Sequence, residues 1–245
     1  MNANVPAHHG FVMNARPRQW ACGAALGVAL LLGACGDRPR VPDWKVNSVG
    51  SVQRATQAYL SGKSRAADQE WNAARGEVSR TGDPQRLAMV ELQRCAAQVA
   101  SAQVGDCPAF EALRADAQPA AQAYADYLAG RTLSAQQIAL LPEQQRKAAT
   151  DAGAIAAIAD PLSLLVASGA ALSGGRATPE TLLKASEVAS AQGWSRALLG
   201  WLGLRAQRAR AIGDLELQAA IERRIALVQA QGRPGPGGPV SGSEK

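Results

Sequence analysis

Histidine is almost absent from this sequence of 245 residues, and its placement excludes several kinds of chemistry. The only two histidines, His8 and His9, precede Cys35, so a chain that begins at Cys35 contains none. Serine–histidine and cysteine–histidine catalysis, histidine general bases and histidine zinc sites are then excluded. We therefore expect neither a metal site nor histidine-based catalysis.

Catalytic motifs are missing as well. The sequence has no G-x-S-x-G or S-x-x-K motif, no phosphate-binding G-x-x-x-x-G-K-[ST] and no paired-cysteine metal spacing. Ser173-Gly174-Gly175 lacks the lysine that a phosphate loop needs, and it is typical of a turn. The sequence predicts a protein that is not an enzyme, with no catalytic residue and no cofactor. An enzyme that acts on cell-wall material through carboxylates is the alternative.

A strong charge of one sign is also lacking. The net charge is +6, and Arg16 and Arg18 lie ahead of Cys35. This mild excess spread along the chain does not indicate a nucleic-acid partner.

A leader-like segment begins the chain. Arg16 and Arg18 precede an uncharged run over residues 21–32, which is too short to remain as a transmembrane helix. The run ends in Leu32-Gly33-Ala34-Cys35. This order of basic, apolar and small residues predicts a secretory signal over residues 1–34.

Leu32-Gly33-Ala34-Cys35 resembles the lipobox of bacterial lipoproteins. The resemblance implies cleavage between Ala34 and Cys35 and lipidation of Cys35, and acyl chains on that cysteine would anchor the protein firmly. In that family an aspartate directly after the cysteine retains the protein in the inner membrane; Gly36 stands there, which favours the outer membrane, facing the periplasm. The alternatives are an ordinary signal peptide with a chance cysteine, or a retained signal anchor. Met13 is an alternative start.

The remaining cysteines form one pair. Cys22 leaves with the leader and Cys35 takes lipid, so Cys95 and Cys107 are left together in an oxidising compartment. We expect a disulfide between them, worth about 3 kcal/mol on the chain-entropy estimate. Two buried free thiols are the alternative.

The rest of the chain predicts one all-α domain over residues 44–231, after a tether over 35–43 and before a disordered glycine- and proline-rich tail over 232–245. Pro119 should break a helical stretch over 109–129, and Ser134 with Gln137 forms a capping-box pattern. Asp160-Pro161 divides an apolar run over 152–172 into two short helices. The other helices are expected near 46–60, 64–80, 84–102, 179–191, 194–211 and 214–230.

A weak repeat joins distant parts of this domain. Residues 74–83 and 205–214 each carry arginine in a helix that ends in Gly-Asp before another helix. The pattern is similar to tetratricopeptide-like arrays of antiparallel helical hairpins, and that resemblance implies a right-handed array with a concave face for peptides or proteins. An ordinary all-α domain with similar turns is the alternative.

Two clusters could form binding surfaces. Trp194, Trp201, Arg205 and Arg208 share one helical stripe that could bind an anionic envelope polymer through indole faces and guanidinium groups. The alternative is that the tryptophans are core residues and the arginine stems reach outward. Tyr124 and Tyr127, beside Asp126, could line a groove or pack between helices.

Together these patterns predict a lipoprotein that acts as an interaction or scaffold module. Its expected partners are the membrane, through the lipid anchor, and envelope proteins or an anionic envelope polymer. Besides the carboxylate enzyme, a protein that binds a small apolar ligand is a further alternative, which requires a cavity lined by residues 152–172.

Overall fold

The computed structural model describes residues 41–230, and every regular element among them is a helix, which confirms the predicted fold class. The expected signal peptide over 1–34, the alternative start at Met13, the lipid site at Cys35 and the tail over 232–245 lie outside the described residues. The helices, with η marking 3-10 helices, are α2 Asp43–Leu60, α3 Ser64–Ser79, α4 Pro84–Ala100, α5 Pro108–Glu111, η1 Arg114–Asp116, α6 Pro119–Leu128, α7 Ala135–Leu140, α8 Glu143–Thr150, η2 Ala152–Ala157, α9 Pro161–Ser173, α10 Pro179–Ala191, α11 Ser195–Ala211 and α12 Leu215–Ala230.

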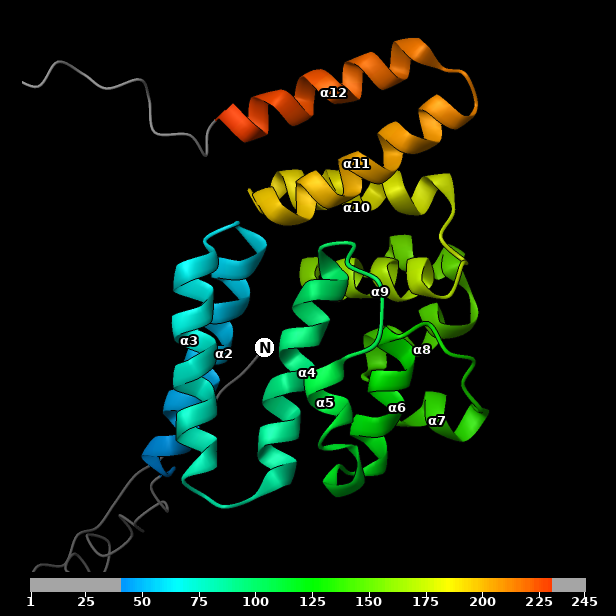
Figure 1. Cartoon of the computed structure of the whole chain (residues 1–245). Helices are drawn as coiled ribbons and strands as arrows, with labels where there is room; N and C mark the ends of the chain where they lie inside the picture. The colour runs from blue at the N-terminus through cyan, green and yellow to red at the C-terminus, as the bar shows by residue number, and fades with distance from the viewer. Residues whose placement is uncertain (1–40, 231–245) are drawn as a thin grey trace, which may run out of the picture. The chain divides into compact units, whose positions relative to one another are not determined.

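Antiparallel hairpins form both ends of this region (Figure 1). Helices α2 and α3 pack along each other near the N-terminal end, and α10, α11 and α12 stack in sequence at the C-terminal end. Between them, the short helices α5 to α8 interrupt any regular series of equal hairpins. The structure therefore has the expected helical hairpins at its two ends.

Helix starts follow the predicted caps. The Asp83 carboxylate accepts a hydrogen bond from the backbone N–H of Gln85, with Pro84 in the first turn. Asp160 accepts from Ser163 N–H ahead of α9, and Ser134 and Gln137 form the capping box of α7. These short-range bonds satisfy N–H groups that a helix start leaves without partners.

The region after α4 differs from the expected helices. Helix α4 ends at Ala100 rather than 102, and Ala102 adopts a positive φ of 62°. The backbone N–H of Gln103 then donates to the Gln98 carbonyl, which closes the helix in the way a terminal glycine usually does. The stretch over 109–129 divides into α5, η1 and α6, and Pro119 stands at the first position of α6.

Helix α4 lies at the centre of the packing, against α2, α3, α6 and α9. Ala88, Leu92, Cys95 and Val99 share one face of α4 and are buried, whereas Ala102 lies past the helix end and is half-buried. At Gly169 on α9, a Cβ atom would collide with the backbone of Val99, so glycine is required for this close approach. A second, smaller apolar cluster around Trp71 joins α2 and α3 to the other side of α4, which carries Val90 and Ala97.

The two copies of the weak repeat share their turn geometry. Gly82 and Gly213 both take a left-handed backbone conformation, with φ of 65° and 76°. Asp83 and Asp214 then each accept a hydrogen bond from a backbone N–H of the following helix. Helix α12 packs inward mainly through Ile221, which is buried.

Candidate functional site

The predicted tryptophan–arginine strip does not form a surface of exposed indole faces. Trp201 is fully buried, and its Nε1–H donates to the Ala100 carbonyl at 3.0 Å. Trp194 is 7% exposed, and its Nε1–H donates to the Gln57 side-chain oxygen at 3.0 Å. The expectation of a polymer-binding strip is therefore wrong for both indoles, because they join α11 to α2 and α4 in the core.

The two arginines of the strip differ in their exposure to solvent. Arg205 is half-buried and donates from Nη1 to the Ser186 hydroxyl at 2.9 Å, and burial holds the pKa of its guanidinium below the ordinary value. Arg208 is exposed. The strip thus corresponds to core tryptophans followed by arginine side chains that reach toward the surface.

The disulfide between Cys95 and Cys107 is confirmed. The bond joins α4 to the residue before α5, with the two Cα atoms 5.6 Å apart. It pins the turn that follows α4, where Ala102 has its unusual backbone conformation.

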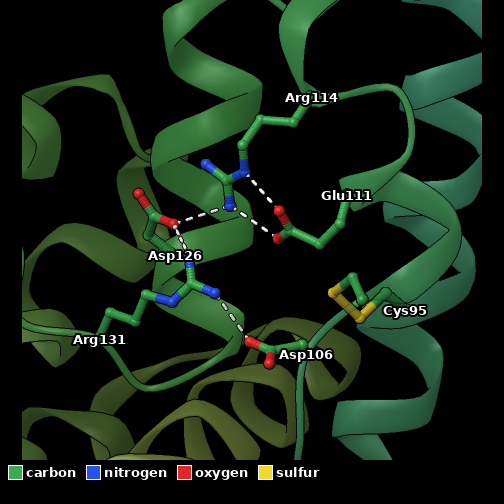
Figure 2. The surroundings of a disulfide bond; sticks show 7 residues. Cys95, Asp106, Glu111, Arg114, Asp126 and Arg131 are labelled. Carbon is green, nitrogen blue, oxygen red and sulfur yellow. Dashed lines mark hydrogen bonds and ion pairs between the residues drawn. A yellow bond between two sulfur atoms is a disulfide. The ribbon is translucent and has the colours of Figure 1, made fainter.

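An ion-pair network lies beside the disulfide (Figure 2). Arg114 bridges Glu111 at 2.6 Å and Asp126 at 2.8 Å, and Arg131 bridges Asp126 at 2.7 Å and Asp106 at 2.8 Å. The hydrogen bond from Arg114 lowers the pKa of the Glu111 carboxyl. Because each of these carboxylates is paired with arginine, the network ties the segment around α5 and η1 to α6.

Tyr124 and Tyr127 pack against each other, and Tyr127 is the more deeply buried of the two. The two rings stack with centroids 6.2 Å apart, and the Tyr127 hydroxyl donates to the Gln145 side chain at 2.8 Å. Burial raises the pKa of both phenols. Tyr127 is a core residue, whereas Tyr124 lines an open hollow beside α4.

That hollow belongs to an apolar groove along α4. One part, of about 660 Å³, lies between α2 and α4. A second part, of about 370 Å³, lies between α4, α6 and the α7–α8 turn. Met89 and Gln93 line both parts, which are therefore contiguous, and we call them together the α4 groove.

Several large apolar side chains of the α4 groove remain in solvent. Val49 from α2 is 52% exposed, Met89 from α4 is 40% exposed and Leu140 from α7 is 45% exposed. They come from three helices: Val49 lines the first part of the groove, Leu140 lines the second, and Met89 lines both. Clustered apolar side chains that the fold leaves uncovered mark a surface for interaction.

The charged side chains of the α4 groove are basic. Lys45 and Arg86 line the α2 end, and the polar residues of both parts are otherwise glutamines and a serine. The Arg86 guanidinium carbon lies 4.3 Å from the Trp44 ring centroid, and its Nε–H donates to Asp83 at 2.7 Å. Stacking and ion pairing thus fix this cation at the rim of the groove.

Sequence reasoning missed the α4 groove because its residues look ordinary within their own helices. Val49 and Met89 each lie in a helix whose sequence is rich in polar residues. The available signal was the spacing of Val46, Val49 and Val52, which places three valines along one side of α2. Only packing between distant helices shows which of them remains uncovered.

Two smaller hollows lie elsewhere among the described residues. One of about 210 Å³ beside the disulfide is lined by Glu91, a buried carboxylate whose Oε1 lies 3.0 Å from Arg75 Nη1. The hollow lined by Ala152 and Ile155 measures about 60 Å³. A volume of that size holds only a few water molecules, so it does not supply the cavity that a small apolar ligand would need there.

Residues 41–230 contain neither a cluster of metal ligands nor a helix that could span a membrane. Histidine, cysteine, aspartate and glutamate form no group of three in this region that could hold a metal ion. None of the helices in the same region is long and apolar enough to cross a membrane. The α4 groove is therefore the site on which a functional argument can rest. In comparisons with protein-family models, curated proteins and solved structures, nothing matches this chain.

Proposed function

We propose that this protein is a lipid-anchored module of the cell envelope that binds another envelope protein through the α4 groove. It acts without catalysis, on the periplasmic side, and Gly36 after Cys35 favours the outer membrane. The observation that carries the proposal is the half-exposure of Val49, Met89 and Leu140, which line two hollows that adjoin at Met89.

The leader sequence supports the proposal that the protein is lipid-anchored. The residues before Cys35 resemble a lipobox, and lipidation of Cys35 would attach the chain to a membrane. The residues from Cys35 to Pro42 reach at most about 30 Å even when extended. A domain tethered in this way can meet only partners close to the bilayer.

The α4 groove supports the proposal that the protein binds another protein. Its lining combines aliphatic side chains with amides, and Met89 lies at the junction of its two parts. Methionine adapts to irregular apolar surfaces, and open apolar grooves commonly receive a segment of another protein.

Crosslinking in intact cells tests this function. A short-range chemical crosslinker should join the wild-type protein to a discrete envelope partner. The substitution Met89→Glu should abolish the product, whereas Arg208→Glu, a charge change on the exposed side of α11, should leave it unchanged. A product that survives Met89→Glu contradicts binding in the α4 groove, provided that circular dichroism shows the variant folded.

A further inference from the structure

The charges around the α4 groove restrict the chemistry of its occupant. Both charged side chains that line it, Lys45 and Arg86, are basic, and they lie together at the α2 end. Asp83 is bonded to Arg86 and offsets part of its charge. Lys45 is exposed in the first turn of α2. An occupant with a negative charge near this end would meet a complementary surface.

The apolar part of the groove favours a helix over an acyl chain. Val49, Met89 and Leu140 keep between 40% and 52% of their surface in solvent, so both parts of the groove border solvent. A lone acyl chain in so open a hollow would leave many methylene groups in water. An amphipathic helix fills an open groove with one face and keeps its polar face hydrated.

The groove is also concave, which a bilayer surface does not match. Its α4 wall carries Met89 and Gln93 at a spacing of four residues, and the opposing walls come from α2 on one side and from α6 and the α7–α8 turn on the other. Apolar residues at i, i+3, i+4 and i+7 of a partner helix could lie along such a channel.

We infer that the occupant of the α4 groove is an amphipathic helix of an envelope protein, with acidic residues beside its apolar stripe. The acidic residues lie at the end where Lys45 and Arg86 line the groove. This inference rests on the proposed function and adds the chemical class of the partner segment.

Designed peptides test the charge requirement directly. Two labelled peptides of about 18 residues, five helical turns, would share one leucine stripe and differ only in carrying glutamate or lysine beside it. Fluorescence anisotropy with the purified full chain carrying Cys35→Ser should show the acidic peptide binding about tenfold more tightly at low salt. Raising the ionic strength should shrink that ratio.

Matched variants make the test specific to the groove. Lys45→Glu combined with Arg86→Glu should reverse the preference between the two peptides. Met89→Glu should weaken binding of the acidic peptide. Arg208→Glu, with its charge change on α11, should alter neither affinity. A scrambled peptide that keeps the glutamates but loses the stripe should not bind.

Several results would overturn the inference. Equal affinity for the acidic and basic peptides would do so, as would palmitate that binds the groove and displaces the acidic peptide. Sedimentation of the Cys35→Ser protein with anionic phospholipid vesicles, lost on Met89→Glu, would identify a lipid surface instead. If the cellular crosslink still depends on Met89 while the peptides show no charge preference, the proposed function stands and only this inference fails.

Discussion

Gly200 on α11 lies directly against the carbonyl oxygen of Ser101, so closely that a Cβ atom at position 200 would collide with that oxygen. The next residue, Trp201, donates its indole N–H to Ala100. Two adjacent residues of α11 therefore fit the C-terminal end of α4, and this contact joins the C-terminal hairpins to the central helix.

The contact predicts opposite effects for two glycines in the same helix. Gly200→Ala should lower the free energy of unfolding by about 1–3 kcal/mol, because the backbones must separate to admit a methyl group. Gly203→Ala has open space around it and should raise the free energy of unfolding by about 0.5–1 kcal/mol through helix propensity. Urea unfolding followed by circular dichroism measures both. Equal effects of the two substitutions would contradict the close approach.

The disulfide should stabilise the fold through its short loop. Because the two cysteines are 12 positions apart in sequence, reduction should lower the free energy of unfolding by about 3 kcal/mol. Unfolding in urea with and without a thiol reductant tests this. The double variant Cys95→Ala and Cys107→Ala serves as the control, because reductant should no longer change its stability.

The network beside the disulfide should make stability depend on pH. The pKa of Glu111 is lowered in the folded protein by the hydrogen bond from Arg114, so the folded state binds the proton less readily than the unfolded chain. The stabilisation is present above the unfolded pKa of about 4.3 and is lost as the pH falls through the folded value. Glu111→Gln should lower the free energy of unfolding by about 1 kcal/mol at pH 7. Between pH 5 and pH 3 the variant should lose less stability than the wild-type protein. Thermal melts across this range measure it, and an unchanged acid slope in the variant would count against the ion pair.

The lipid anchor should depend on a single cysteine. Cys35→Ser removes the thiol that the lipobox-like sequence offers for acylation, so the variant should be lost from the membrane fraction. Cys22→Ser, within the expected leader, should leave membrane attachment unchanged. Firm attachment of the Cys35→Ser protein would instead indicate a retained signal anchor.

Local features of the fold could be predicted because their causes lie within a few residues. Asp83-Pro84 and Asp160-Pro161 cap their helices, and Pro119 starts a new one where its missing N–H does no harm. The disulfide followed from counting the cysteines that remain after the expected leader. The early end of α4 was missed because Ala102 takes a backbone conformation that alanine seldom adopts, in a turn pinned by long-range packing.

The candidate site could not be predicted in the same way. The helical stripe correctly grouped Trp194 with Trp201, but periodicity alone does not say whether a stripe faces the core or the solvent, and here the indoles face the core. The α4 groove requires Val49, Met89 and Leu140 to come together from three helices. Only the tertiary structure brings them together and leaves them uncovered.

The most direct measurement of the central claim is site-specific photocrosslinking in living cells from position 89. A photoreactive amino acid in place of Met89 should form an adduct with one envelope protein, and the adduct should map to an amphipathic segment with acidic residues. The same group in place of Leu227, which is 65% exposed on α12, should form no such adduct. Absence of any adduct from position 89, or the same adducts from both positions, would contradict the α4 groove as the binding site.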